Sequence, residues 1–161
     1  MGILQRETDI IQNPALGSIL IHRFVSSYRE KSEQAVPMQL IFLILPMLYH
    51  KATLEMIDST YESSGLRLLV SKFSKERNKD LLLSIHDQTL RMRELTMDSL
   101  RIALACDLVM LNLNDGKVNI ASQSLPKKYD SQEMVKAAKK LGYWCASLTL
   151  HEISSILKVG F

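Results

Sequence analysis

Along most of the chain, hydrophobic residues recur at the spacing of one face of an α-helix. Asn13-Pro14 is a typical helix start, because Asn is a favoured N-cap and Pro suits the first helical position. Apolar residues then recur at helical spacing until about Glu30, and they are Leu16, Ile19, Leu20, Phe24, Val25 and Tyr28. The pattern predicts an amphipathic helix over residues 13–30.

The most hydrophobic stretch of the chain comes next. The segment from Met38 to Tyr49 has twelve residues, of which only Gln39 is clearly polar. A membrane-spanning helix needs about 18–20 such residues, and Pro46 interrupts this one. We predict that Val36-Pro37 opens a buried helix at the centre of a soluble core, and that Pro46 kinks it or ends its first part. No membrane partner is expected.

The patterns beyond residue 51 predict a short helix or turn over residues 52–61 and helices over residues 66–73 and 81–93. In the last of these, Leu82, Ile85 and Leu90 are expected to share one face. Thr96 or Asp98 is then expected to cap a further helix. Its apolar stripe would consist of Leu100, Ala103, Leu104, Leu108 and Leu111.

Residues 110–121 carry the one clear β-hairpin signal in the sequence. Apolar residues alternate with asparagines on both sides of Asp115-Gly116, a dipeptide that is favoured in tight hairpin turns. A helix followed by such a hairpin is also how a winged helix-turn-helix ends, here with residues 100–108 as the helix and residues 114–117 as the wing tip. Domains of this kind bind DNA or other proteins.

Two capping boxes predict the last two helices. Asp130 with Glu133 would open the first of them, and Thr149 with Glu152 would open the second, which is expected to end at Gly160. The predicted fold is therefore mainly α: a single compact helical domain over residues 1–161 with one β-hairpin and a winged-helix-like second half. Residues 1–12 are expected to form an extended N-terminal segment.

Length and composition fit this picture. The chain has 161 residues, of which 47% are hydrophobic and 23% charged, as is typical of one globular domain. The two cysteines, Cys106 and Cys145, exclude a disulfide-rich scaffold. The first residues lack the apolar segment of a signal peptide, and Arg6 stands where a myristoylation site needs Ser or Thr. We therefore expect a cytoplasmic protein.

The sequence contains no pattern that indicates catalysis. The four histidines, His22, His50, His86 and His151, are not spaced as metal ligands. Phosphate-binding, dinucleotide-binding and nucleophile-elbow motifs are absent from the sequence. We expect the protein not to be an enzyme and to need neither a metal nor a cofactor.

Charge adds a regional asymmetry to this picture. The net charge of +3 is unevenly distributed: five Lys or Arg stand against seven Asp or Glu in residues 1–66, eight against seven in residues 67–116, and seven against three in residues 117–161. One interpretation is an ordinary solvated surface. The other is a basic patch that meets an acidic protein or a nucleic-acid backbone, formed by Arg91, Arg93, Arg101 and Lys117. Aromatic residues for base stacking are missing from this region, which counts against single-strand binding.

Several segments occur in a specific order between about Asn13 and Phe161. They are Asn13-Pro14-Ala15, Phe24-Val25, Tyr28, Val36-Pro37, the run from Leu40 to Pro46, His50-Lys51, Leu141-Gly142-Tyr143-Trp144 and residues 149–159. Together they resemble the middle component of bacterial three-component ABC systems. Two positions depart from the family pattern, because Lys158 stands where Gly is usual and Cys145 where a larger apolar residue is usual.

The resemblance implies a non-catalytic adaptor. In such systems a small protein is encoded with an ABC-type ATPase and a third, variable protein, and the systems are associated with conflict between bacteria and phages or other mobile DNA. The implied partners are thus the ATPase subunit and a third effector component, and contact with DNA through the complex stays open. No catalytic residue is carried over from the family.

For contact with partners we single out His50, Lys51, Arg91, Arg93, Arg101 and Lys117. His50-Lys51 end the apolar segment, so capping of that helix at its C-terminus is their alternative role. Trp144 is expected in the core. The competing functional interpretation is a winged-helix DNA-binding transcriptional regulator, and the sequence predicts no oligomeric state.

Overall fold

The longest helix, α2 (Pro14–Ser32), lies at the centre of the computed structural model, which describes residues 13–73, 79–122, 124–130 and 132–161. The side chain of Asn13 accepts a hydrogen bond from the Ala15 backbone N–H at 2.8 Å, and Pro14 takes the first helical position. The predicted helix start is therefore confirmed. The expected extended segment, residues 1–12, lies outside the described residues.

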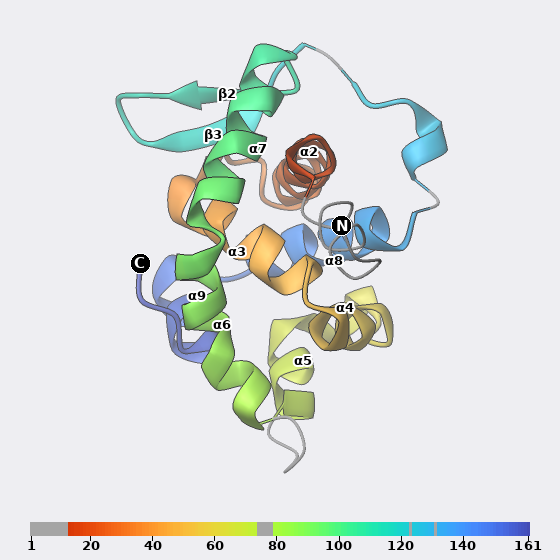
Figure 1. Ribbon diagram of the computed structural model, residues 1–161, viewed down its shortest axis with the longest axis vertical. Helices are drawn as coiled ribbons and strands as arrows, with labels where there is room; N and C mark the ends of the chain where they lie inside the picture. The colour runs from red at the N-terminus through yellow and green to blue at the C-terminus, as the bar shows by residue number, and fades with distance from the viewer. Residues whose placement is uncertain (1–12, 74–78, 123, 131) are drawn as a thin grey trace, which may run out of the picture.

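Two later helices pack most extensively against α2: α7 (Arg93–Ala105) and α8 (Glu133–Ala146). Figure 1 shows α2 nearly end-on, with α7 running beside it. Both crossings are close. A Cβ atom added at Gly17 of α2 would lie 2.1 Å from Ser99 Oγ, and one added at Gly142 of α8 would lie 2.5 Å from the Phe24 carbonyl oxygen. Glycine at these positions lets the helix axes approach.

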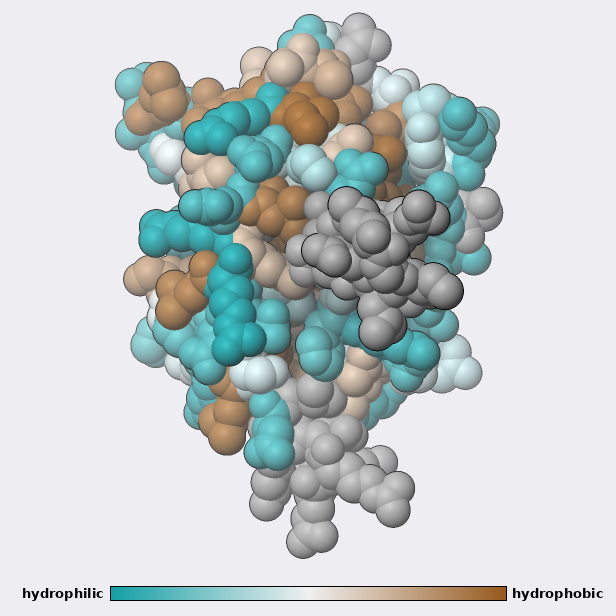
Figure 2. Space-filling view, in the orientation of Figure 1, coloured by the Kyte–Doolittle hydropathy of each residue, from teal (hydrophilic) through white to brown (hydrophobic). Residues whose placement is uncertain are grey.

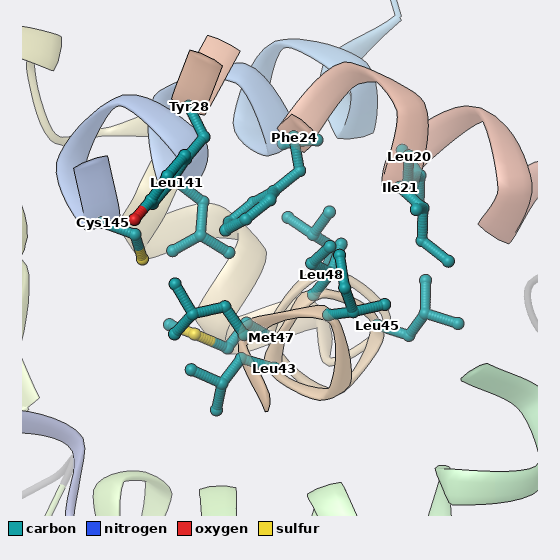
Figure 3. Packing of buried hydrophobic residues seen from close by; sticks show 14 of the residues in the cluster. Leu20, Ile21, Phe24, Tyr28, Leu43, Leu45, Met47, Leu48, Leu141 and Cys145 are labelled. Carbon is teal, nitrogen blue, oxygen red and sulfur yellow. The ribbon is translucent and has the colours of Figure 1, made fainter. Parts of the chain in front are cut away.

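The apolar segment forms α3 (Met38–Leu48), whose residues from Leu40 onward are buried except for Phe42, which is half-buried. In Figure 3, Leu43, Leu45, Met47 and Leu48 of α3 lie opposite residues of α2 and α8 such as Phe24 and Leu141. The predicted core helix is thus confirmed. Pro46 lies in its last turn, and α4 (Lys51–Asp58) continues at an angle of 100° to α3.

Within the described residues, no single helix is both long and apolar enough to cross a membrane. Only α3 and α4 taken together pass by length and composition, and they form a bent pair.

Three further helical elements complete the first part of the chain. They are the short 3₁₀ helix η1 (Glu62–Ser64), α5 (Gly65–Phe73) and α6 (Lys79–Arg91). The expected capping of α7 by Thr96 or Asp98 is wrong, because α7 begins at Arg93, and Thr96 and Asp98 lie inside it. Leu108 and Leu111, which were assigned to the same helix, lie beyond it. Asp107 takes a left-handed conformation with φ of 60° and stops the helix before them.

The strands form one small antiparallel sheet in the order β1-β3-β2. The predicted hairpin is confirmed as β2 (Val109–Asn112) and β3 (Lys117–Ile120). A helix start was expected at Val36–Pro37, but these residues form a short strand, β1, that pairs with β3. The turn has four residues, 113–116, rather than two, because Asn112 pairs with Lys117. Figure 1 shows the hairpin projecting from the helical body. The winged-helix likeness of this half stays a prediction.

The last two helices are α8 and α9 (Leu150–Leu157), which follow a 3₁₀ turn, η2 (Lys127–Tyr129). The capping box of Thr149 and Glu152 is confirmed at the start of α9. The one expected at Asp130 and Glu133 is wrong: Gln132 is the N-cap of α8, and Asp130 instead forms an ion pair with Arg23 of α2.

The end of α9 also differs from the sequence prediction. The helix stops at Leu157, and Lys158 takes the left-handed C-cap conformation with φ of 58°. Gly160, the expected cap, lies two residues further on. The residue that departs from the family pattern therefore adopts the backbone conformation for which glycine is usually selected.

Candidate partner-binding groove

Two adjoining hollows mark the surface where α3, α6 and α7 meet the hairpin turn and the C-terminal residues. The first has a volume of ≈ 460 Å³ and the second ≈ 570 Å³. Phe42 and Arg93 line both hollows, which are therefore direct neighbours. We call the two hollows together the α3–α7 groove. Its first hollow includes Met38, Phe42, Leu90, Arg93, Gly116 and Phe161, and its second Phe42, Arg93, Glu94, Met97, Asp98 and Arg101.

Two hydrogen bonds between distant segments of the chain bring the walls of the first hollow together. The Met38 N–H, at the start of α3, donates to the Gly116 carbonyl in the hairpin turn at 3.0 Å. On the other side, the Gly160 N–H donates to Nδ1 of His86 in α6 at 3.3 Å, and Val159 before it is buried. These contacts hold the hairpin turn and Phe161 beside α3 and α6.

The first hollow presents apolar side chains to solvent. Leu90 is 56% exposed and Phe161 51% exposed, although both are large hydrophobic residues. Figure 2, which views this side of the molecule, shows brown hydrophobic areas interleaved with teal hydrophilic ones. Exposed apolar side chains that line a concave surface are typical of an interaction site.

Arg93 is the central charged residue of the groove. Its guanidinium lies over the ring of Phe42, 5.9 Å from the ring centre, a cation–π geometry. Within the described part of the chain, Arg93 forms no ion pair. Asp98 in the second hollow is paired with Arg101 at 2.8 Å, and Asp115 beside the first accepts a hydrogen bond from the Lys117 N–H.

The structure divides the predicted contact residues. Arg93 and Arg101 line the groove. Lys117 is half-buried at the start of β3, next to Gly116, and Arg91 is exposed at the end of α6. Glu94 and Asp98 lie beside Arg93 and Arg101 on α7, so this surface carries charges of both signs, and a basic patch of the four residues stays a prediction.

His50 and Lys51 lie away from the groove, beyond the opposite end of α3, a helix roughly 16 Å long. They also do not cap α3, because Tyr49 is its C-cap and His50 is the N-cap residue of α4. Nδ1 of His50 lies 3.4 Å from Thr53 Oγ1, and Lys51 pairs with Glu55 at 4.0 Å. The sequence prediction of a C-terminal capping role is wrong, and their part in partner binding stays a prediction.

Sequence reasoning missed the apolar half of the groove. The apolar spacing places Leu90 on one face with Leu82 and Ile85, but Ile85 is buried and Leu90 is exposed. The sequence does contain a signal for this surface, because Leu83 lies seven residues before Leu90. In the structure Leu83 is 68% exposed. Two leucines at that spacing lie on one side of a helix.

Trp144 and the two cysteines do not line the groove. Trp144 is buried, as predicted, and its Nε1–H donates to the Glu62 carbonyl at 2.8 Å. Cys145 is buried too, and burial raises the pKa of its thiol to about 12. Cys106 is exposed after the end of α7. Across residues 13–73, 79–122, 124–130 and 132–161, no group of three His, Cys, Asp or Glu residues could hold a metal ion.

Comparison with known proteins adds one finding. Neither a curated protein nor a solved structure matches the chain. A family described as ABC-three component (ABC-3C) system Middle Component 3 matches residues 1–161, the whole sequence. The match confirms the resemblance to the middle component of three-component ABC systems. The protein therefore belongs to the Middle Component 3 family of ABC-three component systems.

Proposed function

We propose that the protein is a non-catalytic adaptor that links an ABC-type ATPase to a third, effector component. Membership in a middle-component family supports a role beside other components of one system. The observation that carries the adaptor role is the α3–α7 groove, in which Leu90 and Phe161 are about half exposed. Covering them with a partner would remove apolar surface from water, which favours association.

The β-hairpin supports a second contact surface. Leu113 in its turn is 88% exposed, and Met110 on β2 is 54% exposed. Because the hairpin projects from the body (Figure 1), these residues can reach a partner that does not enter the groove. An adaptor needs two surfaces for its two partners, and the groove and the outer side of the hairpin are the two that we assign.

In this proposal the protein works by contact. A nucleotide-dependent state of the ATPase changes how the two surfaces are held, and the effector responds to that change. The system would operate in the bacterial cytoplasm and would act against phages or other mobile DNA, as the family resemblance implies.

The test is co-purification with the neighbouring gene products. The protein, the ABC-type ATPase and the third component are expressed together, with an affinity tag on the ATPase alone. We expect all three to elute as one complex in size-exclusion chromatography. If this protein elutes alone in the presence of both neighbours, the adaptor role is overturned.

A hairpin variant tests the second surface. Leu113→Asp is expected to weaken binding of one partner at least tenfold while the other stays bound. The matched control is Lys136→Glu on the exposed side of α8, which lines neither the groove nor the hairpin. Equal binding by Leu113→Asp and the unsubstituted protein would contradict the assignment of the hairpin.

A further inference from the structure

The outer side of α6 continues the apolar surface of the groove. Helical hydrogen bonds run on from α6 into α7, because the Met92 N–H donates to the Gln88 carbonyl and the Thr96 N–H donates to the Met92 carbonyl, each at 2.9 Å. Figure 1 shows the two helices as one long rod on the face of the molecule. Leu83 and Leu90 lie seven residues apart on this rod, about two helical turns, and both are exposed.

The charge along this surface is polarised toward one end. Arg91 and Arg93 follow Leu90 at the junction of α6 and α7, and both side chains are exposed. Neither forms an ion pair within the part of the chain that the structure describes. Asp87, also exposed, lies between the two leucines. Between Leu83 and Leu90 the exposed charge is negative, and a ligand that passes Leu90 toward the first hollow meets two arginines without an ion pair among the described residues.

From this arrangement we infer that the groove and the outer side of α6 bind an amphipathic helix of a partner subunit, whose apolar stripe ends in a carboxylate at Arg93. Exposed leucines two turns apart match the spacing at which a partner helix presents its own apolar residues. The first hollow, at ≈ 460 Å³, has room for a large apolar side chain of that helix. The carboxylate then forms an ion pair with the Arg93 guanidinium, which already lies over the ring of Phe42.

Charge complementarity favours this occupant over the others. The first hollow is lined by one free cation, Arg93, and by one carboxylate, Asp115, that is already hydrogen-bonded to the Lys117 N–H. A nucleic-acid backbone requires several cations in a row, whereas Asp87 and Glu94 flank the arginines here. The inference rests on the proposed adaptor function, since it names the chemistry of one partner of that adaptor.

Charged substitutions at two groove residues test the inference. Arg93→Glu and Leu90→Asp are each introduced into the protein, which is co-expressed with the ATPase and the third component. The affinity of each variant for each purified partner is then measured by calorimetry. We expect either variant to weaken binding of one partner at least tenfold. Lys136→Glu makes the same charge change outside the groove and is expected to bind as the unsubstituted protein does. Melting temperatures of all variants show whether each remains folded.

A photo-crosslinker at position 90 identifies the occupant. The residue p-benzoylphenylalanine replaces Leu90, the complex is irradiated, and the crosslinked peptide is identified by mass spectrometry. We expect a helical partner segment that carries an acidic residue, and reversal of that residue to Lys is expected to restore binding to Arg93→Glu. A crosslink to a second copy of this chain, to nucleic acid, or to a segment without a carboxylate would overturn the inference.

The two proposals fail in different ways. If the unsubstituted protein binds both partners and Arg93→Glu and Leu90→Asp bind them equally well, the groove inference is overturned and the adaptor function stands. If the unsubstituted protein binds neither partner, the adaptor function is overturned and the groove inference falls with it.

Discussion

Single atoms decide how closely the central helix approaches its neighbours. Gly17 and Gly142 occupy the two crossings of α2, where any β-carbon would meet a neighbouring atom at 2.1 or 2.5 Å. At the first crossing, Ser99 Oγ is buried and has no hydrogen-bond partner among the described residues. A hydroxyl buried without a partner is unfavourable, so this contact is set by size and not by hydrogen bonding.

Gly17→Ala is therefore expected to lower the free energy of unfolding by about 1–3 kcal/mol, because the new methyl group overpacks the α2–α7 contact. Ser99→Ala by itself is expected to be neutral or stabilising, since it removes a buried hydroxyl that has no partner. The double variant is expected to recover only part of the loss. The contact with Ser99 Oγ is gone, but Ser99 Cβ would still lie 2.8 Å from the added carbon. Urea unfolding monitored by circular dichroism measures all three.

Gly160→Ala is the matched control, because a Cβ there would meet only His86 Cε1 at 3.6 Å, an ordinary contact. We expect its stability to change by less than about 0.5 kcal/mol. If Gly17→Ala were as stable as this control, the close crossing of α2 and α7 would be wrong.

The two cysteines are expected to differ in reactivity toward a thiol reagent. The thiolate is the reactive form, and burial raises the pKa of Cys145 to about 12. At pH 8, iodoacetamide is thus expected to label the exposed Cys106 and to leave Cys145 unlabelled until the protein is unfolded, as mass spectrometry of the peptides would show. Equal labelling of both in the folded protein would contradict the buried position of Cys145.

At the scale of elements, the two helix starts whose cap side chain bonds to the backbone, those of α2 and α9, were predicted correctly, whereas the caps expected at Asp130 and at Thr96 or Asp98 were wrong. Asn13 and Thr149 hydrogen-bond to backbone groups two or three residues away, so the sequence carries the whole signal. The start of α7 has no such signal: Met92 makes no side-chain cap, and the helix is placed by packing against α2. The same reason explains β1, a strand of two residues that forms only because β3 pairs with it.

Removal of the confirmed cap is expected to destabilise the protein. In Thr149→Ala the Glu152 N–H loses the hydroxyl that accepts its hydrogen bond at 3.1 Å. A lost N-cap costs about 1 kcal/mol, which thermal unfolding at pH 7 would detect. Ser155→Ala, which removes an exposed hydroxyl within α9, is the control, and a Thr149→Ala effect no larger than that of the control would contradict the cap.

The same capping box makes part of the stability depend on pH. The Thr149 N–H donates to Glu152 Oε2 at 2.7 Å, and this hydrogen bond, followed by that of the Thr149 side chain, lowers the pKa of Glu152. A group whose pKa is lower in the folded state stabilises the protein above its unfolded pKa, about 4.3 for Glu, and loses that contribution as pH falls through the folded value. We expect Glu152→Gln to be less sensitive than the unsubstituted protein to a fall from pH 6 to pH 3. Parallel pH profiles of stability would contradict this.

At the scale of the whole molecule, the acidic N-terminal part and the basic C-terminal part of the sequence pack against each other. Lys140 of the C-terminal part donates to the Asp58 backbone carbonyl at the end of α4 at 2.8 Å, and Lys31 of the N-terminal part lies over the ring of Tyr143 in α8. Lys139 and Lys140 both lie in α8. Folding mixes the regions because α2 packs directly on α8.

This mixing leads to a prediction about DNA. The outer side of α7, the helix before the hairpin, carries Glu94 and Asp98 beside Arg93 and Arg101. Phosphate contacts need uncompensated cations, so we expect the isolated protein to bind random duplex DNA only weakly, with dissociation constants of about 10⁻⁴ M or weaker at physiological salt. Gel shifts at low and high salt test this. Tight binding with a steep salt slope that is lost in Arg91→Ala and Arg93→Ala would favour the DNA-binding regulator instead.

The sequence alone determined the elements that depend on local patterns. The apolar segment of α3, the hairpin around Asp115-Gly116, and the caps of α2 and α9 all follow from side chains that act within a few residues of one another. The mainly α class with one hairpin follows from them.

Only the tertiary structure decided the groove. Its first hollow joins Met38, Leu90, Gly116 and Phe161, which are far apart in the chain and meet through the hydrogen bonds of Met38 with Gly116 and of Gly160 with His86. Helical periodicity limited where Leu90 could point, but whether that side of α6 would be covered depended on the packing of the other helices. Local spacing predicts the direction of a side chain within its own element, and the presence of a neighbour over it is set by contacts between distant parts of the chain.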